Sequence, residues 1–93
     1  MLKPTEELRQ LREQLRSMDQ HLLEALHLRF EHAKKIGAFK KKNKIAIEDL
    51  NREAENKSHN IKLMDGQLKK EIVTEFTDFL IRWSKDIQAE STN

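Results

Sequence analysis

Cysteine is absent from the sequence, which excludes a disulfide framework, a thiolate metal site and a cysteine nucleophile. Glycine occurs twice and proline once among 93 residues, so turn signals are scarce and no glycine-rich phosphate loop is present. Charged and hydrophobic residues each make up 37% of the chain. This composition favours long amphipathic helices over sheets. We therefore predict an all-α fold in which residues 1–93 form a single domain.

Long apolar runs are also missing. The N-terminal segment MLKPTEELRQ reaches a charge within three residues, and no stretch approaches the roughly 20 apolar residues of a membrane span. We therefore expect a cytoplasmic protein with no membrane association. The formal net charge is only +2, yet residues 34–44 carry six lysines and no acid. A helical interaction module or nucleic-acid-binding module is thus an alternative, although no recognised binding motif accompanies these lysines.

Hydrophobic periodicity predicts a very long first helix, from Thr5 as its N-cap to about Lys42. Gly37 is a weak stop signal because helix-compatible residues follow it. At about 100° per residue, the apolar stripe of this helix falls within a sector about 80° wide. The stripe consists of Leu8, Leu11, Leu15, Met18, Leu22, Leu26, Ala33 and Ile36.

Two shorter helices are predicted to follow. The second begins at Asp49, a suitable N-cap, and ends near Met64, and a turn signal at Asp65 and Gly66 leads to a third helix over about residues 67–89. The second helix places Ile47, Leu50, Ala54 and Ile61 near one face. The third has a predicted core face of Leu68, Ile72, Phe76, Phe79, Leu80, Trp83 and Ile87. Because these helices are too short to cover the first stripe, we expect an intertwined or side-by-side homodimer.

Three cations lie in or beside the stripe of the first helix. Arg29 is near its centre, and Lys40 reaches the same face about 16 Å further along the axis. A buried guanidinium needs an anionic partner, so the two cations together suggest an anion site. Arg12 lies about 25 Å from Arg29, too far for both side chains of one helix to grip one small molecule. Each cation alone also fits a solvated or ion-paired side chain.

Polar groups on the other two helices complete the candidate set. Asp49, Arg52 and Glu53 are spaced to form one cluster on the second helix, or to pair with one another within it. Ser84 and Gln88 lie one turn apart beside the apolar face of the third helix. The four histidines fall outside the stripes and lack the spacing of metal ligands, so we expect surface positions and no metal site.

The order and spacing of these residues resemble the motifs of the all-helical (type II) chorismate mutases, which are small intertwined homodimers of three-helix chains. The segment LRQLREQLRSMDQHLLEALHLRFEHAKKIGAFK, residues 8–40, is similar to the first helix of that family. DLNREAE resembles the acidic motif of the second helix, and SKDIQ matches the serine and glutamine of the last helix. The resemblance extends over nearly the whole chain.

The resemblance implies a rearrangement of chorismate to prephenate, for phenylalanine and tyrosine biosynthesis or a related pathway, with no cofactor. It implies that Arg29 of one subunit and Arg12 of the other hold the two carboxylates of the substrate. Lys40 and Gln88 would flank the ether oxygen. Glu53, with the backbone near Asp49, would accept the ring hydroxyl. The other implied pocket residues are Arg52, Ser84, Ile36 and Ile81.

The sequence departs from the family pattern before the second helix. Relatives often carry a proline where this chain has Ile45, Ala46 and Ile47, and also where Leu50 follows Asp49; we interpret these changes as differences in loop rigidity. The related isochorismate-pyruvate lyases share the arginine and lysine scaffold but usually lack the acidic cluster, so the cluster favours the mutase. That lyase and a 4-amino-4-deoxychorismate mutase are the alternatives on the same fold.

Overall fold

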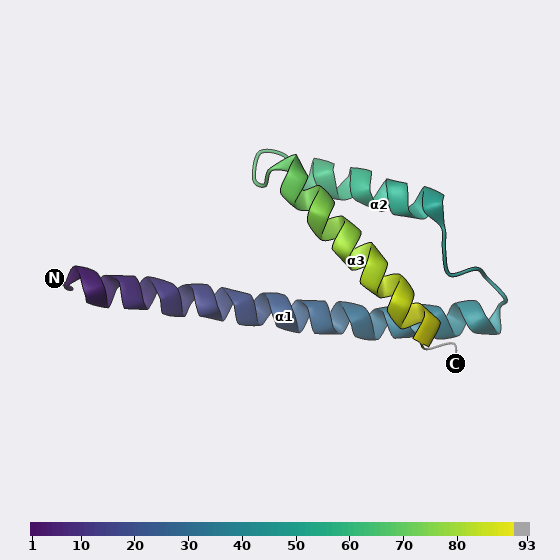
Figure 1. Ribbon diagram of the computed structural model, residues 1–93, viewed down its shortest axis with the longest axis horizontal. Helices are drawn as coiled ribbons and strands as arrows, with labels where there is room; N and C mark the ends of the chain where they lie inside the picture. The colour runs from purple at the N-terminus through teal and green to yellow at the C-terminus, as the bar shows by residue number, and fades with distance from the viewer. Residues whose placement is uncertain (91–93) are drawn as a thin grey trace. The chain divides into compact units, whose positions relative to one another are not determined.

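The structure of the chain is a computed structural model that describes residues 1–90. Its helices are α1 (Pro4–Lys42), α2 (Leu50–Leu63) and α3 (Lys70–Glu90), shown in Figure 1. The described residues contain no strand, which confirms the all-α prediction. The chain divides into a first unit of residues 1–31 and a second unit that begins at residue 32 and contains the end of α1 together with α2 and α3.

α1 starts two residues before the predicted position. Pro4 opens the helix, a position where its fixed φ and missing N–H are well tolerated. The Lys3 carbonyl accepts hydrogen bonds from the Glu6 and Glu7 N–H groups, both at 3.0 Å. Thr5 therefore lies inside the first turn, and its prediction as the N-cap is wrong. The helix then continues through Gly37, as predicted.

A Schellman motif ends α1 and begins the joint to α2, residues 43–49. The Ile45 N–H donates to the Lys40 carbonyl at 2.8 Å, and the Lys44 N–H donates to the Lys41 carbonyl at 3.3 Å. Lys44 takes the left-handed φ of 54° that this motif requires, at a position where glycine is usual. The joint therefore starts from a sharply defined, hydrogen-bonded helix end.

The bounds of α2 agree with the prediction, whereas the turn after it is longer than predicted. Asp49 is the N-cap of α2. Gly66 supplies the left-handed turn residue with a φ of 79°. The Gln67 N–H still belongs to the turn, because it donates to the Met64 carbonyl at 2.9 Å. As a result α3 begins at Lys70 instead of near residue 67.

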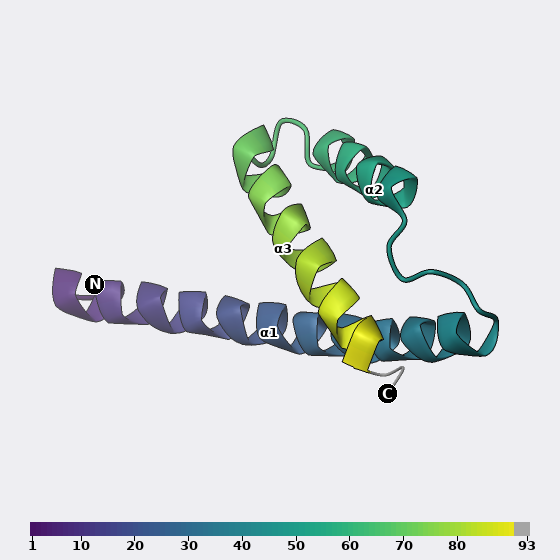
Figure 2. The ribbon, with the colours of Figure 1, turned by 45° about the vertical axis from the view of Figure 1, so that its right-hand side comes forward.

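Within the second unit, α2 and α3 are antiparallel and connected by polar contacts. The two ribbons lie closest at the turn that joins them and diverge away from it in both views (Figures 1 and 2). Near the turn, Asn60 Nδ2 donates to Thr77 Oγ1 at 3.1 Å, and Lys57 Nζ lies 2.6 Å from Asp78 Oδ1. From one contact to the next, the residue number decreases on α2 and increases on α3, as expected for an antiparallel pair.

The face that α2 presents to α3 is polar. Lys57 and Asn60 on this face are partly buried, whereas Leu50 is 68% exposed and Ala54 is exposed as well. Of the four apolar residues predicted to share a face, only Ile47 and Ile61 are partly buried. The four apolar residues predicted to lie near one face do not form the contact with α3, because α2 and α3 meet through hydrogen bonds and ion pairs.

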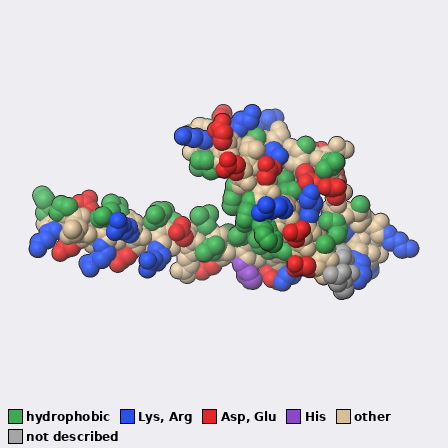
Figure 3. All heavy atoms as spheres, in the orientation of Figure 1, with side chains coloured by type: hydrophobic (Ala, Val, Ile, Leu, Met, Phe, Trp, Pro, Cys, Tyr) green, Lys and Arg blue, Asp and Glu red, His purple; other side chains and the backbone are tan. Residues whose placement is uncertain are grey.

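On α3, the predicted core face and the buried face are different. Val73, Thr77, Ser84 and Gln88 are buried. Most large side chains of the predicted face are exposed instead, including Phe76 at 51% and Trp83 at 42%, whereas Leu80 and Ile87 are partly buried. Figure 3 shows hydrophobic side chains gathered over α3, and the rings of Phe76 and Phe79 stack with centroids 6.2 Å apart. The predicted core face of α3 is therefore largely uncovered in the single chain.

The single chain buries very little hydrophobic surface. Among the described residues, the buried hydrophobic side chains are Ala33, 4% exposed, and Val73, 6% exposed. In the first unit, Leu11, Leu15 and Leu22 of the α1 stripe are each more than half exposed. So small a core cannot offset the conformational entropy of ordering the chain, about 1–2 kcal/mol per residue. Within residues 1–90, no helix combines the length and apolar composition needed to cross a membrane.

Candidate active site

Lys40 stands apart from the other lysines at the end of α1. It is partly buried, whereas Lys41, Lys42 and Lys44 are exposed, which is the division that the stripe predicts. Its Nζ donates a hydrogen bond to the carbonyl of Ile47 in the joint at 2.8 Å. An ammonium group has three N–H donors. Lys40 therefore connects the end of α1 to the joint. This contact uses only one of the three N–H donors of its ammonium group.

Asp49 serves the local structure of α2. Its Oδ1 accepts a hydrogen bond from the Arg52 N–H at 3.0 Å, and its backbone is extended, with a φ of −141°. The Arg52 guanidinium does not join this carboxylate but lies 3.6 Å from Glu55, with the side chains of both residues more than two thirds exposed. The predicted cluster of Asp49, Arg52 and Glu53 side chains is therefore not formed in the structure.

Glu53 is instead paired with α3. Its side chain is 22% exposed, and its Oε1 accepts a hydrogen bond from Lys85 Nζ at 3.1 Å. The same Nζ lies 3.2 Å from Glu48 Oε1 in the joint. The other oxygen, Glu53 Oε2, is buried and accepts no hydrogen bond from residues 1–90. A buried carboxylate oxygen in this state is costly, since such atoms nearly always have a donor.

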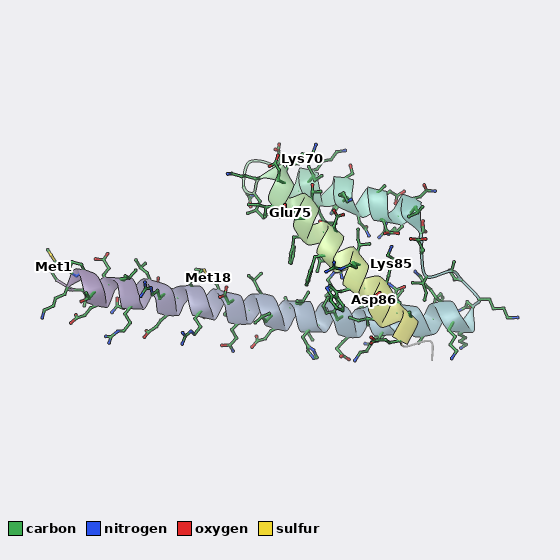
Figure 4. The ribbon with its side chains drawn as sticks, in the orientation of Figure 1. Met1, Met18, Lys70, Glu75, Lys85 and Asp86 are labelled. Carbon is green, nitrogen blue, oxygen red and sulfur yellow. The ribbon has the colours of Figure 1, made fainter. Side chains whose placement is uncertain are left out.

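Lys85 is a residue of this region that the sequence analysis did not single out. Figure 4 shows it on the side of α3 that faces α2. The hydrogen bond to Glu53, followed by that to Glu48, raises the pKa of Lys85, so its ammonium remains charged at neutral pH. The signal that could have found it is helical spacing, because Lys85 lies four residues after Ile81 and three before Gln88.

The other predicted residues of α3 lie on this same side. Ser84 and Gln88 are each only 8% exposed, and Ile81 is partly buried. In α1, Ile36 is 39% exposed, while its neighbour Gly37 is buried. Buried hydroxyl and amide groups on α3 thus share the second unit with Lys40 and Glu53.

Arg12 and Arg29 belong to the first unit. Both side chains are exposed by overall area, so the prediction that Arg29 is enclosed in a core is wrong for the single chain. Partial burial nevertheless lowers the pKa of the Arg29 guanidinium, which stays cationic because the ordinary arginine value is far above neutral pH. A shallow groove on this unit, lined by residues such as Asp19, Leu23 and His27, is the surface of a single helix and contains no predicted site residue.

The predicted site residues of the second unit therefore come from four neighbouring segments: the end of α1, the joint, the first turn of α2 and the last turns of α3. Hydrogen bonds from Lys40 and Lys85 reach the joint from α1 and α3. All four histidines are exposed. No group of three or more potential metal-ligating side chains occurs among residues 1–90.

The protein-family model of type II chorismate mutases matches residues 11–89. The chain belongs to the type II chorismate mutase family. The matched segment spans every predicted site residue, from Arg12 to Gln88, and confirms the resemblance that the motifs indicate. Membership in this family supports chorismate mutase activity. No curated protein and no solved structure matches the chain significantly.

Proposed function

We propose that this chorismate mutase family member converts chorismate to prephenate, in the cytoplasm and on the route to phenylalanine and tyrosine. The observation that carries the proposal is that Lys40 and, through Lys85, Glu53 are both bonded to the joint before α2, in the unit where Ser84 and Gln88 are also buried. These residues include no nucleophile activated by a base. The reaction needs none, because it is an intramolecular rearrangement that depends on folding the substrate and stabilising charge.

Lys40 and Gln88 are the proposed partners of the ether oxygen. Negative charge grows on this oxygen as its bond to the ring breaks, and a positioned ammonium group stabilises such a developing charge. Lys40 already points toward the joint through its bond to Ile47, and its remaining N–H groups are the proposed donors to the ligand. Gln88, buried on α3, is the proposed neutral donor to the same oxygen.

Glu53 is the proposed acceptor for the ring hydroxyl of chorismate. Its Oε2 is buried, with no hydrogen bond from residues 1–90, and a substrate hydroxyl would satisfy it. The backbone near Asp49 is the second proposed acceptor. We assign Arg52 and Ser84 to the rim of the same pocket, and Ile36 and Ile81 to its apolar walls.

The two carboxylates of chorismate are proposed to bind Arg29 of one subunit and Arg12 of the other, since a planar guanidinium binds a carboxylate through two parallel hydrogen bonds. A homodimer is supported by the exposed apolar side chains of α1 and α3, which leave the single chain almost without a hydrophobic core. We expect sedimentation to give twice the chain mass of 11.1 kDa. A monomer at assay concentration would contradict the shared site.

The activity is tested with chorismate, isochorismate and 4-amino-4-deoxychorismate offered side by side to the purified protein. We expect prephenate formation from chorismate to have the highest kcat/KM. Lys40→Ala should lower this value at least about 100-fold, the usual cost of removing one donor to a developing oxyanion. The control is Lys41→Ala, an exposed neighbour, which should stay within about twofold of the wild type. Preferred formation of salicylate and pyruvate from isochorismate would identify a lyase instead.

Sharing of the site between subunits is tested by mixing two inactive variants. If Arg12 acts in the partner's site, a dimer of one Arg12→Ala chain and one Arg29→Ala chain has one intact site and one that lacks both arginines. Random exchange makes half of the dimers mixed, so the mixture should recover roughly a quarter of wild-type activity. A mixture that exchanges subunits yet stays inactive would show that both arginines act within one chain.

A further inference from the structure

The ammonium group of Lys85 joins three segments of the second unit. It extends from α3, contacts Glu53 Oε1 on α2 at 3.1 Å and contacts Glu48 Oε1 in the joint at 3.2 Å. Figure 4 shows the side chain directed away from α3 on the side of α2. These contacts lie near the start of α2. At this end, the ribbons of α2 and α3 are farther apart than at the turn that joins them (Figures 1 and 2). We call this arrangement the Lys85 bridge.

The charges of the Lys85 bridge indicate what it does. One ammonium group faces two carboxylates, so the group of three keeps a net charge of −1. Two of its three N–H donors are used in these contacts. The charge of Lys85 is therefore compensated by Glu48 and Glu53. We do not expect it to bind a carboxylate of the substrate.

The bridge also decides which oxygen of Glu53 remains for a ligand. Lys85 occupies Oε1, and Oε2 is the buried oxygen that accepts no hydrogen bond from residues 1–90. Ordering a glutamate side chain costs rotamer freedom, and a charge-assisted hydrogen bond is strong enough to hold it in one position. Through Glu48, the same ammonium anchors a joint that contains no proline.

We propose that Lys85 is a positioning residue that fixes the Glu53 carboxylate so that Oε2 faces the ring hydroxyl of the substrate. The proposal rests on the proposed function, because it gives Glu53 a partner within the same reaction. Lys85 itself does not touch the substrate. Its effect on the reaction passes through Glu53, with Glu48 holding the joint in place.

The test is a double-mutant cycle on kcat/KM for chorismate, with Lys85→Met and Glu53→Ala as its single variants. We expect Lys85→Met alone to lower kcat/KM about tenfold, because a misplaced contact group costs on the order of 10- to 100-fold. In the Glu53→Ala background the same change should have less than about a twofold effect, since the group to be positioned is gone. Lys85→Arg should restore most of the activity, because a guanidinium can also contact two carboxylates.

Lys57→Met is the matched control. Lys57 also connects α2 to α3, but its ammonium pairs with Asp78, at 2.6 Å, whereas the ammonium of Lys85 pairs with Glu53. This variant loses an ion pair between the same two helices, so a general loosening of the pair would affect both variants alike. We expect Lys57→Met to keep kcat/KM within about twofold of the wild type and to lose no more thermal stability than Lys85→Met.

Each outcome of this experiment has a definite meaning. An active wild type with an equally active Lys85→Met variant overturns the positioning role and leaves the proposed function intact. An equal loss from Lys85→Met with and without Glu53 also overturns it, because the effect then does not pass through Glu53. A wild type that leaves chorismate unchanged overturns both proposals.

Discussion

The two left-handed residues among residues 1–90 provide a matched pair for testing how α1 ends. Lys44 has a φ of 54°, and Gly66 has a φ of 79°. A residue with a Cβ loses about 1–2 kcal/mol in the left-handed region, and glycine avoids this cost. Glycine in turn stabilises the unfolded chain through its extra freedom, by about 0.4–1 kcal/mol. Lys44→Gly should therefore stabilise the fold by about 0.5–1 kcal/mol net.

Gly66→Ala should have the opposite effect for the same reasons. A Cβ added at Gly66 meets nothing within 4 Å, so a collision does not contribute and the backbone conformation alone sets the cost. We expect a loss of about 0.5–1 kcal/mol. For a chain of this length, 1 kcal/mol corresponds to a Tm change of about 4–8 °C. The two variants should therefore differ by about 4–16 °C, with Lys44→Gly the more stable.

Thermal unfolding followed by far-UV circular dichroism measures both variants. All samples need the same protein concentration, because the Tm of an oligomer depends on it. Lys44 is exposed, so removing its side chain should cost little packing. A Lys44→Gly protein with an unchanged or lower Tm would refute the left-handed assignment, and with it the Schellman end of α1.

Three further predictions follow from single contacts. Asp49→Ala removes the N-cap of α2 and should cost about 1 kcal/mol in urea unfolding; Asp49→Asn should keep most of that stability, and equal losses in the two variants would contradict the cap. Thr77→Val removes the acceptor of Asn60 from a position that is 3% exposed and should cost about 1–2 kcal/mol; an unchanged urea midpoint would exclude this bond. Because carboxylates raise the pKa of Lys85, the stability from its ion pairs is complete below the unfolded-state pKa and is lost as the pH rises through the raised folded-state pKa. Wild type and Lys85→Met should therefore differ at neutral pH and converge above the usual lysine pKa of 10.5; a difference that stays constant into the alkaline range would contradict the bridge.

The proposed homodimer rests on residues that look like a core in the sequence. Phe76 and Trp83 repeat at helical spacing and read as the inward face of α3, yet they are exposed in the single chain. The buried face instead contains Val73 and Thr77, which directly follow Ile72 and Phe76 of the predicted face. Periodicity identifies an apolar face but not what covers it, because the pattern along one helix carries no information about its neighbours.

The candidate site divides in the same way. Lys40 could be separated from the exposed Lys41 and Lys42 because its angular position on a helix follows from residue number alone. The partner of Glu53 could not be predicted, since Lys85 is 32 residues away in sequence and a lysine side chain on a helix usually lies in water. Asp49 was expected in a side-chain cluster, but its carboxylate instead accepts a hydrogen bond from the backbone N–H of Arg52 in α2.

The sequence by itself determined the three helices, most of their bounds and the family of the chain. Helix caps, apolar periodicity and motif spacing are local properties, and each acts within a few turns of the same helix. Only the tertiary structure decided which face of α3 is buried and which cation holds Glu53. Those outcomes depend on how α2 and α3 pair across the turn at Gly66, where long-range packing and competition between charged partners select one contact among several that the sequence permits.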